Sequence, residues 1–237
     1  MSTENTETIE QETRHSSVQA DGALSTQLQT QAKPIIAIVV VVVLAVAGYY
    51  WYSTSQAEKN AEGLTHLARI RATFDSGDFT KALTGDSLPP VGTDAVKGLL
   101  AISSEYDGTD AGAISALMAG NALVNLGRFE EAQQQFERAQ SSSAQVVEVG
   151  ALQGLAVVKE SAKDFAGAAE LYEKAYSKGE KSGLEERALF HAALCYEYAG
   201  NTQKATELYR TVVKKYEMSE VAASARGGLA RLGMAID

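Results

Sequence analysis

The stretch that decides the fold is GRFEEAQQQFERAQ, residues 127–140. Within it Phe129, Ala132, Phe136 and Ala139 recur at intervals of three, four and three residues, which places them on one face of an α-helix. Gly127 comes before them, and glycine most readily adopts the left-handed conformation that ends a helix. The stretch therefore predicts the end of one helix, a tight turn, and a second, amphipathic helix that a neighbour approaches closely.

The same small–aromatic–small pattern returns twice later in the chain. The two further copies are Ala168, Tyr172 and Ala175, and then Ala205, Tyr209 and Val212. The corresponding first residues are 36 and 37 positions apart, and a partial copy lies upstream at 77–82. One copy alone would be an ordinary amphipathic helix. Three copies in phase predict helical hairpins stacked into a solenoid.

Periodicity and capping residues predict an all-α chain beyond the first 53 residues. Helices are expected at 55–76, briefly after 79, and at 94–106, 112–126, 129–140, 144–161, 165–177, 183–199, 202–216 and 219–233. Thr109, Asp164, Asn201 and Ser219 are suited to capping the helices that follow them. The last helix has no partner in sequence and is expected to cap the solenoid.

Composition excludes several classes of protein. The chain of 237 residues carries a net charge of −9, with a pI of about 5.0, which argues against a nucleic-acid-binding surface. Its single cysteine, Cys195, cannot form an intrachain disulfide and is expected to pack inside a helix pair. His66 and His191 lack neighbours at metal-ligand spacing and are interpreted as packing or surface residues. No cofactor and no enzymatic activity are predicted.

The first 52 residues differ from the rest. Residues 1–33 are polar, with five acidic and two basic side chains, and are predicted to be a disordered acidic tail. Residues 34–52 are predicted to be a transmembrane helix, because 35–52 contain no charge and extend about 27 Å as a helix. Their Ile, Val and Leu residues favour insertion by about 3–6 kcal/mol. The cluster Tyr49, Tyr50, Trp51 and Tyr52 is expected to anchor the span at one interface.

Two questions about this segment stay open. Ala45-Val46-Ala47 fits the cleavage rule of a signal peptide, although the preceding region is acidic where a basic one is expected. Flanking basic residues number two before the span and three after it, so charge does not favour a cytoplasmic N-terminus.

Residues 60–233 resemble the tetratricopeptide-repeat family. Together with the span, the stretches KALTGD (81–86), EYDGTDAGA (105–113) and GRFEEA (127–132) are similar to YfgM-like, single-span tetratricopeptide proteins of bacterial envelopes, of the Bacteroidetes–Chlorobi type. The resemblance implies a linker helix and atypical first repeat over 53–111, then three repeats and a cap over 112–233. It also implies an inner-membrane protein with a cytoplasmic N-terminus, periplasmic repeats and an ancillary role near the Sec translocon and envelope chaperones.

Outer-membrane assembly lipoproteins share one feature, a Tyr-x-x-Ser/Thr-Asp/Glu joint that occurs here at 106–110 and 216–220. They need a lipid-bearing cysteine near the N-terminus, and Cys195 is far from it.

In tetratricopeptide domains the first helix of each pair lines a concave groove. The matching positions here are Leu117, Asn121, Val124, Asn125, Gln153, Val157, Glu160, Phe190, Leu194, Glu197 and Tyr198. Amides and aromatic rings suit an extended or helical peptide. Leu117 stands where carboxylate-clamp domains have a lysine, so an acidic chaperone C-terminus is not the expected ligand. The alternative is that these side chains only pack and that the solenoid is a structural, self-associating subunit.

Overall fold

The computed structural model describes residues 4–86, 88–90, 95–180 and 183–235, with side chains described from residue 38 onward. The chain divides into two compact units, residues 1–55 and residues 56–237. Helix α1 (Glu4–Asp75) contributes to both units. The side chains of residues 1–33 lie outside the part that the structure describes, so the disorder predicted for this tail stays a prediction.

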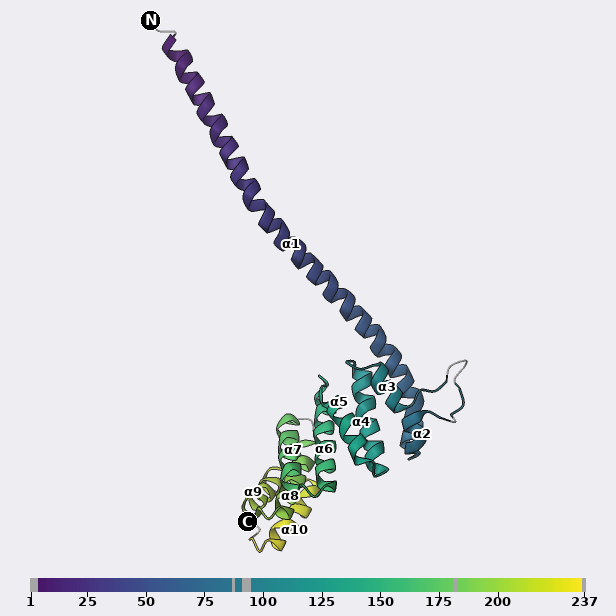
Figure 1. The fold of residues 1–237 in the computed structure, drawn as a ribbon. Helices are drawn as coiled ribbons and strands as arrows, with labels where there is room; N and C mark the ends of the chain where they lie inside the picture. Colours follow the sequence, from purple (N-terminus) through teal and green to yellow (C-terminus); the bar gives the residue numbers. More distant parts are fainter. Residues whose placement is uncertain (1–3, 87, 91–94, 181–182, 236–237) are drawn as a thin grey trace. The chain divides into compact units, whose positions relative to one another are not determined.

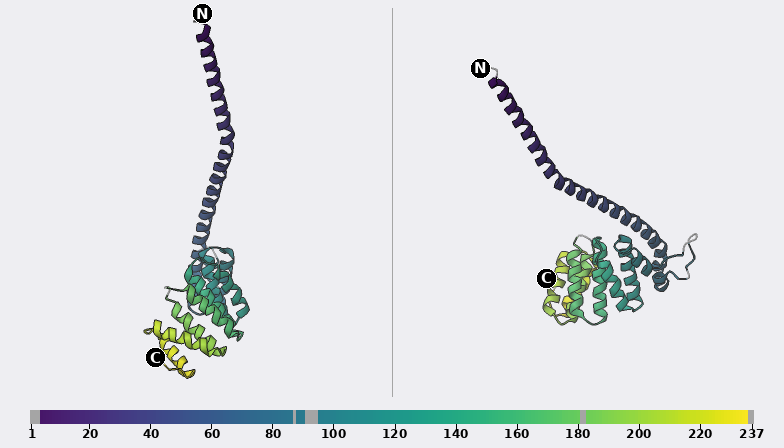
Figure 2. Two further views of the ribbon diagram at one scale, coloured as in Figure 1. Left: turned by 90° about the vertical axis from the view of Figure 1, so that its left-hand side faces the viewer. Right: turned by 45° about the horizontal axis from the view of Figure 1, so that its top comes forward.

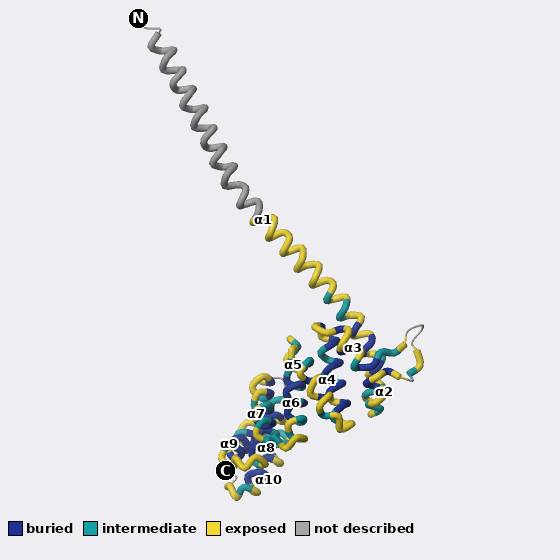
Figure 3. Tube along the Cα trace, in the orientation of Figure 1, coloured by how far each residue is buried: buried dark blue, intermediate teal, exposed yellow. Residues whose placement is uncertain are grey.

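The described part of the first unit is a single helical segment whose side chains are exposed. From Ile38 to Tyr52 every residue is exposed, which Figure 3 shows as a continuous yellow stretch of α1. Apolar side chains of this kind are normally covered, either by a neighbouring protein element or by the hydrocarbon of a lipid bilayer. Among the described residues, one helix is long and apolar enough to cross a membrane, and it includes this stretch.

The second unit is a row of helices that follow one another in antiparallel pairs (Figures 1 and 2). After the end of α1 come α2 (Phe79–Thr84), α3 (Leu99–Glu105), α4 (Asp110–Asn125), α5 (Phe129–Gln140), α6 (Gln145–Ser161), α7 (Phe165–Lys178), α8 (Glu185–Tyr198), α9 (Thr202–Lys215) and α10 (Glu220–Arg231). Successive helices make the main contacts, as expected of a solenoid. The all-α prediction and its helical hairpins are confirmed.

The turn inside each pair has one recurring backbone conformation. The residue at this turn has a positive φ in all four pairs, at Gly77, Gly127, Lys163 and Gly200. Three are glycines, for which this conformation carries no Cβ penalty, whereas Lys163 adopts it with φ of 60°.

The predicted caps are present in the structure. The side chains of Thr109, Asp164, Asn201 and Ser219 each accept a hydrogen bond from a backbone N–H in the first turn of the helix that follows. Because these signals are local in sequence, the helix boundaries agree closely with those expected.

Small residues let the aromatic side chains of the second helices enter the core. Ala132, Ala168 and Ala205 are fully buried. The ring of Phe136 is buried so close to Gly120 and Gly154 that a Cβ at Gly154 would lie 2.4 Å from it. One aromatic side chain therefore fills the space between the first helix of its own pair and that of the next.

The first pair is shorter and is followed by an irregular connection. Leu67 and Ile70 from α1 share a buried cluster with Ala82 and Leu83 of α2. The helix expected from residue 94 instead begins at Leu99. The reason is the close approach at Gly98, where a Cβ would lie 2.3 Å from the carbonyl oxygen of Leu83. The chain here packs along the end of α2 before it turns into α3.

Candidate protein-interaction groove

The groove residues predicted on α4 divide into exposed amides and half-buried apolar side chains. Asn121 and Asn125 are exposed, and the Asn125 amide donates a 2.8 Å hydrogen bond to the backbone carbonyl of Asn121. Leu117 lies against Gly150 of α6, so it helps to close the α4–α6 contact. Val124 packs against the buried cluster that contains Phe136. Of these four residues, the two asparagines are the exposed ones.

On α6 the predicted residues are all half-buried. Gln153 and Val157 lie one turn apart, and the Gln153 side-chain nitrogen is buried without a hydrogen-bond partner. Glu160 accepts a 2.6 Å hydrogen bond from the hydroxyl of Tyr172 on α7. Part of this surface therefore stabilises its own repeat.

On α8 the predicted residues range from half-buried to exposed. Phe190 is half-buried, with its ring 6.0 Å from that of Tyr209, and Leu194 is also half-buried. Tyr198 is 59% exposed, and its ring centroid lies 5.3 Å from that of Phe165 on α7. Tyr198 is thus an exposed aromatic side chain that lies beside the half-buried ring of Phe165.

The side chain of Glu197 accepts three hydrogen bonds from other helices of the domain. It accepts a 2.7 Å hydrogen bond from the Tyr209 hydroxyl and two of 2.8 Å from the guanidinium of Arg231 on α10. The Arg231 hydrogen bonds hold the pKa of Glu197 below its usual value, against the opposing effect of burial. Glu197 is therefore paired with a positive charge inside the domain, whereas Glu160 is hydrogen-bonded to a neutral hydroxyl.

Sequence reasoning missed the partners of these two carboxylates. Tyr172 and Tyr209 each follow their glutamate by twelve residues, and this shared spacing was the available signal. Arg231 lies 34 residues beyond Glu197, too far for any local pattern to reveal.

A second polar connection also went unpredicted. Glu173 accepts hydrogen bonds from the Tyr196 hydroxyl, at 2.6 Å, and from Lys204, at 2.7 Å. It joins α7 to both α8 and α9, so the C-terminal pairs are connected by polar as well as apolar contacts.

The histidine and the cysteine of α8 pack as expected. His191 stacks on the ring of Tyr172 at 5.3 Å, and burial lowers its pKa. Cys195 is fully buried, and burial, with the nearby Glu160 carboxylate, raises the pKa of its thiol to about 12. A thiol with that pKa is a poor nucleophile at neutral pH. Among the described residues no group of His, Cys, Asp and Glu is placed to hold a metal ion.

The hollows in the described surface lie away from the predicted groove. One of about 800 Å³ is open at the α9–α10 connection, beside Lys215 and Met218. Another, of about 750 Å³, lies along α9 beside Met234. Neither of these two hollows is lined by a predicted groove residue.

Comparison with known protein families identifies the repeats. Two tetratricopeptide-repeat models match the chain, one over residues 117–183 and the other over residues 187–217. The matched segments cover most of α4 to α9, which are the three pairs that share the spacing of Ala132, Phe136 and Ala139. A search among curated proteins finds no match. The chain thus contains tetratricopeptide repeats, an architecture of protein-interaction scaffolds, and no catalytic family is indicated.

Proposed function

We propose that this protein is a membrane-anchored scaffold that binds segments of other proteins on its tetratricopeptide repeats. The observation that carries the proposal is one chain combining an exposed apolar helix with repeats whose first helices present Asn121, Asn125 and Tyr198 to solvent. The amides can hydrogen-bond a peptide backbone, and the ring of Tyr198 offers stacking area beside Phe165.

The hydrogen bonds that Glu160 and Glu197 accept within the domain affect which ligands the groove can bind. Both carboxylates already accept hydrogen bonds from buried tyrosines, and Glu197 is also paired with Arg231. A basic segment could pair with Glu197 only in competition with Arg231, which weakens the attraction of that position for positive charge. The proposed ligand is therefore an extended or helical segment with apolar and uncharged polar side chains.

The finer proposal is a bacterial inner-membrane protein whose repeats face the periplasm, beside the Sec translocon and its chaperones. It rests on the resemblance of KALTGD and EYDGTDAGA to envelope proteins and on the span. The first test is topology. A reporter fused after Asp237 should be active on the periplasmic side, and a cytoplasmic result would remove the envelope role while leaving the scaffold proposal intact.

Partner binding is tested by site-specific crosslinking in membranes. A photoreactive residue at Asn121 or Tyr198 should trap discrete protein partners. The matched control is Gln134, which is exposed on α5, the second helix of its pair. Equal trapping at Gln134 would contradict binding at the predicted groove. If the products from Asn121 and Tyr198 were only dimers of this chain, the self-associating structural subunit would be the better description.

A further inference from the structure

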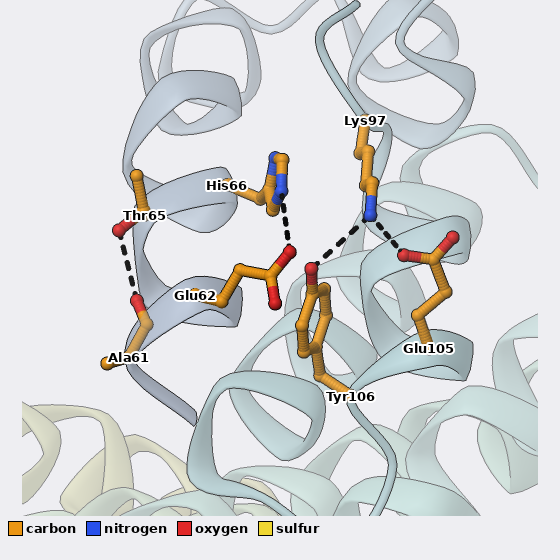
Figure 4. Close-up of polar contacts among 7 residues, drawn as sticks. All are labelled: Ala61, Glu62, Thr65, His66, Lys97, Glu105 and Tyr106. Carbon is orange, nitrogen blue, oxygen red and sulfur yellow. Dashed lines mark hydrogen bonds and ion pairs between the residues drawn. The ribbon is translucent and has the colours of Figure 1, made fainter. Parts of the chain in front are cut away.

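A cluster of polar side chains joins the base of α1, which is its C-terminal part over residues 56–75, to the repeats (Figure 4). His66, on α1, lies with its ring centroid 5.9 Å from that of Tyr106, which follows α3. The Tyr106 hydroxyl accepts a hydrogen bond of 3.3 Å from Lys97, and Lys97 also pairs with Glu105. All of these residues belong to the second unit of the chain.

Tyr106 is the centre of the contact that fixes this part of α1. Its ring lies so close to Gly63 that a Cβ there would be 2.8 Å from it, and 2.7 Å from the Cβ of Ala111. One turn earlier, the Asn60 side chain accepts a 2.9 Å hydrogen bond from the backbone N–H of Ala111. The α1 backbone at Gly63 thus lies directly against the Tyr106 ring and the start of α4.

The site of His66 suits a neutral ring and not a charged one. Only 9% of the residue is exposed, and Nδ1 is buried without a hydrogen-bond partner. Nε2 lies 3.9 Å from a Glu62 carboxylate oxygen, which is beyond hydrogen-bond distance. A proton added to Nδ1 would create a buried charged donor with no acceptor.

The charged groups around His66 oppose one another. Lys97 from the connection before α3 and Arg69 from α1 disfavour a positive charge on the ring, whereas Glu62 and Glu105 favour it. Lys97 is tied to Tyr106 and Glu105, so it cannot move away without breaking the same contact.

We propose that His66 is an acid-sensitive latch that holds the base of α1 on α3 and α4 while its imidazole is neutral and releases it on protonation. Burial, followed by the charge of Lys97, lowers the pKa of His66 below its ordinary 6.5. Because the folded pKa is the lower one, the latch is complete above pH 6.5 and weakens as pH falls below that value. The latch controls how firmly the repeats are held to the helix that continues into the apolar span.

The test is hydrogen exchange of the full chain in detergent micelles between pH 8 and pH 5, corrected for intrinsic exchange rates. Protection at residues 60–70 and 99–106 should fall on acidification, by up to tenfold for each pKa unit that separates the folded and unfolded states. Protection of α5, which carries no histidine, should change much less. An equal loss across all the repeats would overturn the latch.

Two variants separate His66 from general acid sensitivity. His66→Phe keeps an aromatic ring beside Tyr106 but cannot titrate, so the local pH response should disappear. His191→Phe removes the histidine of α8 and should leave that response in place. If the response persisted in His66→Phe, the proposal would be wrong.

A direct titration keeps the proposal testable even if His66→Phe does not fold. The His66 ring resonance of the unaltered chain, followed by NMR, must have its midpoint below pH 6.5. Lys97→Met should move that midpoint upward, because it removes the positive charge with the largest lowering effect on the pKa of His66. A midpoint at or above 6.5 in the unaltered chain would rule out the latch.

Discussion

Glu160 accepts a 2.6 Å hydrogen bond from the hydroxyl of Tyr172, and the same pair recurs in the next repeat as Glu197 and Tyr209, at 2.7 Å. In the repeat before them the corresponding positions are Val124 and Phe136, again twelve residues apart. A glutamate therefore occurs on the first helix where the second helix carries a buried tyrosine, and an apolar residue where it carries phenylalanine. The hydroxyl explains this pattern, because burial without an acceptor is costly.

This pairing predicts strong coupling between Glu160 and Tyr172. Glu160→Val alone should destabilise the chain by about 1–3 kcal/mol, because the Tyr172 hydroxyl loses its acceptor. Tyr172→Phe alone should cost less, since the half-buried Glu160 can be hydrated. The double variant reproduces the Val124–Phe136 pair and should recover most of the loss. Urea unfolding of all four proteins measures the cycle, and strictly additive losses would show that the pair is not coupled.

Lys163 adopts a left-handed backbone conformation that the equivalent turns of this chain give to glycine. The equivalent turns use Gly77, Gly127 and Gly200, whereas Lys163 holds φ at 60°. Lys163→Gly should stabilise the chain by about 0.5–1 kcal/mol, because it removes the Cβ penalty at a site where glycine fits. The matched control, Lys174→Gly, lies exposed within α7 and should destabilise by about 1 kcal/mol. Equal effects from the two changes would contradict this account of the turn.

Much of the fold could be predicted because its signals are local. The helix predicted over 129–140 coincides with α5, since a left-handed glycine, a buried alanine and a buried aromatic residue all lie within ten positions of one another. The start of α3 could not be predicted in the same way. It depends on the approach of Gly98 to the Leu83 carbonyl, a contact between segments that no periodicity encodes.

The candidate groove was only partly predictable for the same reason. Repeat phase identifies the positions of Glu160 and Glu197 on the first helices, but it does not reveal what their carboxylates contact. The bond from Arg231 to Glu197 crosses from α10 to α8 and spans 34 residues. Which groove positions serve a partner stays a prediction, with Asn121 and Tyr198 the exposed residues to test first.

Packing and binding positions should respond differently to substitution. Ala132→Trp should lower stability by about 3 kcal/mol, because the fully buried site has no space for an indole. Gln134→Trp, exposed on the same helix, is the matched control and should change stability little. Asn121→Ala should keep stability within about 0.5 kcal/mol while it weakens crosslinking to partners. Thermal unfolding and crosslinking yield are the two measurements, and an unchanged melting temperature for Ala132→Trp would contradict the repeat assignment.

The Arg231–Glu197 contact should make the attachment of α10 to α8 depend on pH. Arg231 hydrogen bonds keep the pKa of Glu197 below 4.5, so the contact contributes its full stability above that value and loses it as pH falls through the folded pKa. The difference in unfolding free energy between the unaltered chain and Arg231→Met should therefore be constant from pH 7 to about pH 5 and shrink toward zero in stronger acid. Arg226→Met, on the same helix, is the control, because Arg226 makes no ion pair among the described residues. Its difference should not vary with pH in this range. A difference for Arg231→Met that persisted unchanged to pH 3 would show that Arg231 acts through packing of its side chain and not through the Glu197 carboxylate.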